Sequence, residues 1–139
     1  MANLHGLENP EKSIQNVVDL WECETFFQKP IGTFSHGMKK RVGLSVATIH
    51  NPPFIILDEP YSGLDLSQNQ NLSNFIASRK QRQQTILLST HIVPYAAELC
   101  DRAFYIEQGS VAEIIEWKNW DKPTRIQKIT SMVENKGRK

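Results

Sequence analysis

Runs and periodicities of apolar residues divide the chain into alternating strands and helices. Residues 54–57 are four consecutive large apolar residues, Phe-Ile-Ile-Leu, and residues 85–89 form a second run. We expect two strands that are buried on both faces, because a half-exposed strand would alternate apolar and polar positions. Residues 103–115, interrupted by Gln108 and Gly109, are typical of a β-hairpin.

Five other segments carry apolar residues at helical spacing. They cover about residues 14–21, 35–49, 67–80, 92–99 and 123–135. In the second of these segments Ser35 is a good N-cap. One apolar face of that helix is expected to consist of Met38, Val42, Val46 and Ile49. The alternation of strands and helices predicts an α/β fold with a mainly parallel sheet.

The composition is that of an ordinary globular domain. The 139 residues are 40% apolar and 22% charged, which excludes a disordered chain, and the net charge of +1 does not favour nucleic-acid binding. Cys23 and Cys100 have no metal-binding or redox spacing, so we expect buried free thiols in a reducing compartment. Since no apolar stretch is as long as a membrane span and the N-terminus lacks a signal-peptide pattern, we expect a soluble, cytoplasmic chain.

Two adjacent carboxylates, Asp58 and Glu59, directly follow the apolar run at 54–57. Open α/β sheets bind ligands at the carboxyl ends of their strands. Two acids there suit a magnesium–nucleotide site, because one can hold the metal, directly or through water, while the other orients a nucleophile. The run alone leaves open the alternative of solvated acids that end a core strand.

Three stretches stand in a suggestive order. Residues 34–41, Phe-Ser-His-Gly-Met-Lys-Lys-Arg, open a helix; residues 54–65 carry the acids and a loop; and residues 87–91 end a strand with a histidine. Together they resemble the C-terminal half of ATP-binding-cassette (ABC) ATPases, the nucleotide-binding subunits of ABC transporters. In that family a signature motif, LSGGQ, precedes the Walker B strand, a D-loop follows, and a switch histidine ends a later strand. The resemblance covers roughly residues 4–115.

The resemblance implies a fold and three catalytic positions. The fold would be a partial P-loop NTPase (RecA-like) parallel sheet flanked by helices, with part of the ABC helical subdomain. Asp58 would hold Mg²⁺, usually through water, and Glu59 would polarise the attacking water as general base. His91 would contact the γ-phosphate and help to fix Glu59 and the water. The alternative for His91 is a surface histidine at the start of a helix.

The resemblance also implies contacts across a dimer. Ser35 and Gly37 would face the γ-phosphate of ATP held by a partner subunit, since a helix N-terminus presents unpaired N–H groups to an anion. The alternative for Ser35 is a plain N-cap. Ser62, Gly63 and Asp65 would form the D-loop at the interface, although Asp65 alone would be interpreted as a turn aspartate.

The signature departs from the family pattern. Phe34 stands for the usual leucine, His36 for the first glycine and Met38 for the glutamine. Because glycine is useful where backbone approaches a ligand closely, His36 is expected to change the geometry of the signature or to add a donor. The continuation Gly-Met-Lys-Lys-Arg resembles exporter-type ATPases, and residues 39–41 are expected to form a solvated helix face.

The chain contains no GxxxxGK[ST] stretch and no convincing Q-loop. We therefore expect the distal part of a longer ATPase, inactive alone, that starts inside the helical subdomain. Residues 1–50 would be a helical-subdomain remnant with the signature helix, residues 51–115 a RecA-like portion, and residues 116–139 a C-terminal helix with a basic tail. Residues 85–89 would present an unpaired apolar edge, which predicts poor solubility.

These resemblances imply ATP binding and hydrolysis with Mg²⁺ in a head-to-tail dimer of nucleotide-binding domains. The dimer would sit on a transmembrane permease at the inner face of the cell membrane. One alternative is a non-catalytic interaction module that donates its signature to a partner's ATP, and another is a soluble ABC ATPase without a transport role. The retained pair of Glu59 and His91 favours descent from an active enzyme, but whether this chain is an enzyme stays open.

Overall fold

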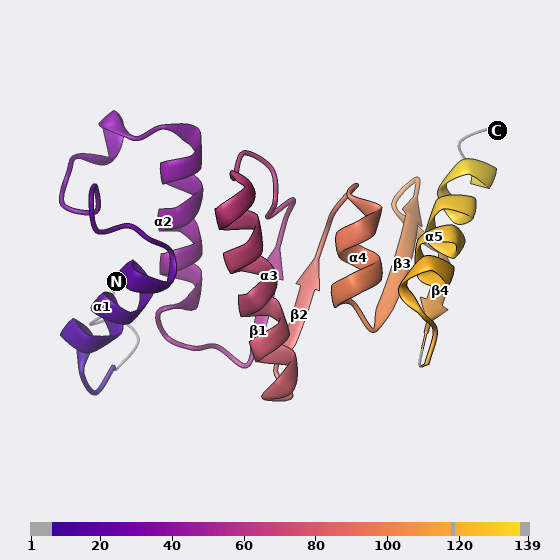
Figure 1. The fold of residues 1–139 in the computed structure, drawn as a ribbon, viewed down its shortest axis with the longest axis horizontal. Coiled ribbons are helices and arrows are strands. Elements are labelled where there is room, and N and C mark those ends of the chain that lie inside the picture. Colours follow the sequence, from indigo (N-terminus) through magenta and orange to yellow (C-terminus); the bar gives the residue numbers. More distant parts are fainter. Residues whose placement is uncertain (1–6, 118, 137–139) are drawn as a thin grey trace. The chain divides into compact units, whose positions relative to one another are not determined.

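The computed structural model describes residues 7–117 and 119–136 (Figure 1). The chain divides into two compact units, with the boundary in the sequence between Ser89 and Thr90. The first unit contains α1 (Pro10–Leu20), a 3₁₀ turn (Ile31–Thr33), α2 (His36–Thr48), β1 (Phe54–Leu57), α3 (Leu66–Gln81) and β2 (Thr85–Leu88). The second contains α4 (Val93–Leu99), β3 (Arg102–Glu107), β4 (Ser110–Glu116) and α5 (Lys122–Lys136). The three-part division by function predicted above stays a prediction.

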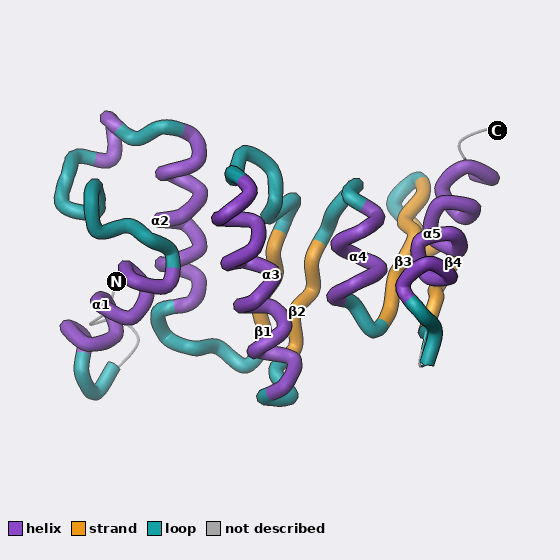
Figure 2. Tube along the Cα trace, viewed as in Figure 1, coloured by secondary structure: helices purple, strands orange, loops and turns teal. Residues whose placement is uncertain are grey.

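From α2 to β3, helices and strands alternate along the chain (Figure 2), as the apolar pattern predicts. The helix ends follow local capping chemistry. Asn9 caps α1 by accepting a hydrogen bond from the Lys12 N–H at 3.0 Å, and Pro10 occupies the first turn, where no intrahelical acceptor is required. Residues 4–6, where the resemblance begins, and the end of the basic tail lie outside the described residues.

The first unit contains a two-stranded parallel sheet. β1 and β2 pair in register, with Ile55 opposite Ile86 and Leu57 opposite Leu88. The prediction that these strands are buried on both faces is wrong for the described part of the chain, because Ile55 is 4% exposed and Ile56 65%. Helix α3 packs against the sheet, and the face that carries Ile56 stays largely uncovered by described residues.

The buried face of α2 is not the predicted apolar one. Val46 is 42% exposed, whereas Leu44 and Thr48 are buried. Thr48 belongs to the core because the indole N–H of Trp21 donates to its hydroxyl at 3.1 Å and that hydroxyl donates to the Leu44 carbonyl at 2.8 Å. A satisfied hydroxyl can be buried at little cost, so a pattern that counts threonine as polar could not place Thr48 in the core.

The second unit is built around the predicted hairpin. β3 and β4 are antiparallel, and Gln108 and Gly109 join them with φ of 48° and 77°, the two left-handed residues that a tight hairpin turn needs. Its core lies between the hairpin, α4 and α5. The buried members are Ala97, Ile115, Trp117, Ile129 and Met132.

Both cysteines are free thiols, and Cys23 is buried while Cys100 is half-buried. Burial raises the pKa of the Cys23 thiol, partly opposed by its contact with the Ser45 hydroxyl. Within the described ranges, no helix is long and apolar enough to cross a lipid bilayer.

We expect Cys23 to resist alkylation in the folded chain, because the reactive thiolate is both inaccessible and disfavoured there. In a Cys100→Ser variant, the iodoacetamide reaction should proceed only as fast as the chain unfolds, and it should accelerate in urea. Rapid labelling of that variant in native buffer would contradict the buried position of Cys23.

Candidate functional site

The two acids lie where the parallel strands end, as predicted. Asp58 and Glu59 follow β1, and Ser89 follows β2. The Ser89 hydroxyl donates to the Asp58 carboxylate at 2.5 Å and accepts from the Glu59 N–H at 2.9 Å. Ser89 therefore fixes both acids relative to the second strand. Sequence reasoning assigned Ser89 only to the strand; the signal that could have identified it is its position, one residue beyond the end of a paired parallel strand.

Lys40 reaches the same corner from α2. Its ammonium donates to the Glu59 carbonyl at 2.7 Å and lies 3.5 Å from the Asp58 carbonyl. Glu59 itself has a positive φ of 41°, a strained conformation for a non-glycine residue. A charge-assisted hydrogen bond to its carbonyl is well placed to hold that conformation.

The prediction that residues 39–41 form a solvated face is therefore wrong for two of the three. Besides the contact of Lys40, Arg41 donates to the Glu22 carbonyl at 2.8 Å and lies 4.6 Å above the Phe26 ring. Both side chains are long enough to reach neighbouring loops, a tertiary contact that a charge run in sequence does not reveal. Lys39 is exposed, as predicted.

The signature segment begins α2, as predicted. The Ser35 hydroxyl accepts from the Met38 N–H at 3.2 Å and caps the helix. The first N–H groups of a helix have no intrahelical acceptor, and α2 begins at His36 and Gly37. Since Ser35 and His36 are exposed and Gly37 is half-buried, this helix end is open to an anionic group.

The loop after the acids lies against the signature. Gly63 has φ of 75°, and a Cβ built there would lie 2.4 Å from Cδ2 of His36. A Cβ at Gly37 would lie 3.1 Å from the Gly63 carbonyl oxygen. The His36 ring therefore fills the space beside Gly63, and the expected change in the geometry of the signature stays a prediction.

Three predicted residues remain: Ser62 and Asp65 in the loop after the acids, and His91 after β2. The Ser62 N–H donates to the Glu59 carbonyl at 3.2 Å, which folds the loop back on the acids. Asp65 is the N-cap of α3, where its carboxylate accepts from the Gln68 N–H at 2.9 Å. Capping α3 is a structural role, and the further role of Asp65 in a D-loop at a dimer interface stays a prediction. His91 is exposed and belongs to the second unit, so its role beside Glu59 stays a prediction.

A hollow of about 510 Å³ opens between α2 and the end of β1, beside Asp58. Its polar lining comes from His36, Lys39, Lys40 and Asp58. Two lysines and a helix N-terminus beside a carboxylate are suited to a polyanion that carries a divalent metal.

The donor set around Asp58 fits Mg²⁺ better than a metal that is held by protein alone. The Asp58 side chain is exposed, and one carboxylate oxygen is engaged by Ser89. Among the residues that the structure describes, no group of three or more His, Cys, Asp or Glu side chains could hold a metal. Mg²⁺ keeps several waters and is usually bound by one or two carboxylates together with substrate phosphates, which a single exposed Asp58 can satisfy.

Comparison with known proteins agrees with this geometry. A family model described as "ABC transporter" matches residues 6–62. The ABC transporter ATP-binding protein NatA of Bacillus subtilis is 34% identical over 79% of this chain and 46% of NatA. The bacitracin transport ATP-binding protein BcrA of Bacillus licheniformis is 34% identical over 89% of this chain and 40% of BcrA. The chain thus spans less than half the length of these relatives.

Solved structures give the same result for the fold. A dimeric ATP-binding cassette, MJ0796, in a post-hydrolysis state with ADP and Pi superimposes with a TM-score of 0.72 at 22% identity, over 80% of this chain and 48% of that one. This likeness confirms the predicted fold class, and the relatives confirm the predicted resemblance. The chain therefore matches part of the ATP-binding domain of the ATP-binding proteins of ABC transporters.

Proposed function

We propose that this chain supplies part of the nucleotide site in the ATP-binding subunit of an ABC transporter, of the exporter type. The observation that carries this proposal is the corner where Asp58 and Glu59, bridged by Ser89, lie beside the start of α2. Relatives that are named for binding ATP and for transport support it.

In this proposal Asp58 holds Mg²⁺ through water, with Ser89 orienting the carboxylate. When bound, Mg²⁺ neutralises charge on the β- and γ-phosphates. Glu59 polarises the attacking water, and the Lys40 contact keeps its backbone in the left-handed conformation that aims the side chain. His91 contacts the γ-phosphate.

The proposed dimer is a head-to-tail pair of ATP-binding domains. Ser35 and Gly37 of one domain face the γ-phosphate held by the other, with His36 as an added donor. The loop of Ser62, Gly63 and Asp65 crosses the interface. A transmembrane permease is the further partner, and it would hold the assembly at the inner face of the membrane. The dimer of the solved cassette supports the pairing.

The 139 residues contain no GxxxxGK[ST] phosphate cradle, so we expect weak nucleotide binding. Calorimetric and ¹⁵N-NMR titration of a Glu59→Gln variant with Mg-ATP should give a Kd of about 1 mM or weaker, equivalent to roughly 4 kcal/mol. Mg-ATP should shift the amide signals of residues 35–37 and 58–59. In a double variant that also carries Asp58→Asn, Mg-ATP should no longer shift these signals.

Micromolar binding, or shifts confined to other residues, would place the nucleotide elsewhere and contradict the proposed site. Complete absence of shifts at residues 58–59, with a response at residues 35–37 only, would favour the non-catalytic module that donates its signature to another subunit.

A further inference from the structure

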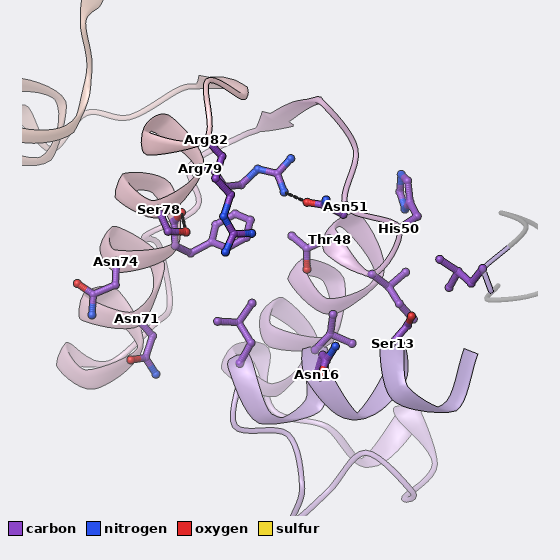
Figure 3. A pocket seen from close by; sticks show the side chains of 15 residues that line it. Ser13, Asn16, Thr48, His50, Asn51, Asn71, Asn74, Ser78, Arg79 and Arg82 are labelled. Atoms are coloured by element: carbon purple, nitrogen blue, oxygen red, sulfur yellow. Dashed lines mark hydrogen bonds between the residues drawn. The ribbon is translucent and has the colours of Figure 1, made fainter. Parts of the chain in front are cut away.

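A second cavity, of about 670 Å³, lies in the first unit between α1, the end of α2 and α3 (Figure 3). None of the proposed nucleotide-site residues lines it. Its lining mixes apolar side chains with uncharged hydrogen-bonding ones; the hydrogen-bonding side chains on α1 and α3 are Ser13, Asn16, Asn71, Asn74 and Ser78. Its charged lining is basic, and no described Asp or Glu belongs to it.

Arg79 is the unusual member of this lining. Its side chain is 3% exposed, yet its hydrogen bonds in the structure reach only neutral oxygens, the Asn51 amide at 2.9 Å and the Pro52 carbonyl. Its Nε, also buried, has no hydrogen-bond partner among the described residues. Burial, together with the neighbouring Arg82, lowers the pKa of Arg79. A buried guanidinium that has no counter-charge among the described residues is costly.

Arg82 adds a second positive charge to the same wall. It is the C-cap residue of α3, three positions after Arg79, so the two side chains lie on one side of the helix. Figure 3 shows both extending from α3 toward the cavity. The contacts with Asn51 and Pro52 explain two hydrogen bonds of Arg79. They do not explain why Arg82 lies beside a guanidinium that has no counter-charge among the described residues.

We propose that this cavity is an anion site that takes a phosphate group, either free or carried by a small organic molecule. The phosphate lies against Arg82, whose guanidinium is accessible, and its charge compensates that of Arg79 behind it. Arginine suits this task because its planar set of N–H donors matches phosphate oxygens. The hydroxyl and amide groups along α1 and α3 are suited to the hydroxyls of an attached sugar, and the cavity is much larger than one phosphate.

The test compares the 139-residue chain with Arg82→Gln and, as a matched loss of one charge, Lys29→Gln in an exposed loop. Each protein is titrated with inorganic phosphate, with ribose 5-phosphate and with ribose at constant ionic strength, by calorimetry and thermal unfolding. We expect saturable binding of both phosphates to the wild type, with a rise in Tm. Arg82→Gln should weaken binding about tenfold or more, the effect of losing roughly 1.5 kcal/mol of a charge-assisted hydrogen bond, whereas Lys29→Gln should change nothing.

Two further variants test whether phosphate binds in this cavity or at the acids, and whether Arg79 takes part in binding or has only a structural role. Asp58→Asn should keep the phosphate effect, and its loss there would assign the anion to the acids and overturn the cavity site. Arg79→Met should abolish the phosphate-induced rise in Tm, and a full rise in that variant would overturn the proposal. If Arg79→Met does not fold, Arg82→Gln still decides.

The remaining outcomes are equally direct. Absence of saturable phosphate binding by the wild type, or equal losses in Arg82→Gln and Lys29→Gln, would overturn the site. Tighter binding of ribose 5-phosphate than of phosphate would support an organic phosphate as the ligand, and equal affinities would support free phosphate at the same site.

Discussion

A Trp21→Ala substitution is expected to lower the free energy of unfolding by about 3–5 kcal/mol, the cost of a large cavity in a packed core. Trp21 is fully buried, its ring centroid lies 5.2 Å from that of Phe75 on α3, and its N–H bonds to Thr48 on α2. The indole therefore joins the segment after α1 to both α2 and α3.

Urea unfolding followed by circular dichroism measures this effect. Trp120→Ala is the matched control, because Trp120 is 38% exposed and should cost much less. Trp21→Phe should lie between the two, since it keeps ring packing and leaves the Thr48 hydroxyl without the indole N–H. Equal losses of unfolding free energy in Trp21→Ala and Trp120→Ala would contradict the buried position of Trp21 in this core.

A Gly63→Ala substitution is expected to cost roughly 2–3 kcal/mol of stability, because it combines left-handed strain with a clash. The new methyl group would meet the His36 ring at 2.4 Å, a distance that requires the ring or the loop to move. Since His36 begins the signature helix and Gly63 belongs to the loop after the acids, the contact makes these two parts of the proposed site interdependent.

A double-mutant cycle isolates the clash from the strain. With His36→Gly present, Gly63→Ala should cost about 1–2 kcal/mol less than it does alone. Gly109→Ala is the matched control, because Gly109 has φ of 77° but nothing within 4 Å of a built Cβ. Its cost should be that of strain only and should not depend on His36. Additive effects of His36→Gly and Gly63→Ala would contradict the contact.

Sequence reasoning was most successful where a feature depends on neighbouring residues. Ser35 before the second helix is a capping signal, and α2 begins there. The Gln108–Gly109 turn and the acids after residues 54–57 were found for the same reason: a turn or a strand end is specified within a few residues. The family resemblance rested on motifs of this local kind.

It was least successful where burial depends on what packs against an element. Ile56 is as apolar as Ile55, yet Ile56 is exposed and Ile55 buried, because the described residues cover one face of the sheet and leave the other largely open. Thr48 and Arg79 are polar, yet both are buried, because partners distant in the sequence satisfy them wholly or in part.

The sequence by itself determined the order of the elements, the Ser35 cap, the position of the acids at a strand end and the resemblance to ABC ATPases. Only the tertiary structure decided that Ser89 bridges Asp58 and Glu59, that Lys40 holds the Glu59 carbonyl and that His36 fills the space beside Gly63. The physical reason is that capping and strand formation are set over a few residues, whereas these contacts join segments 18 or more residues apart, and which side chains meet depends on packing and strand register.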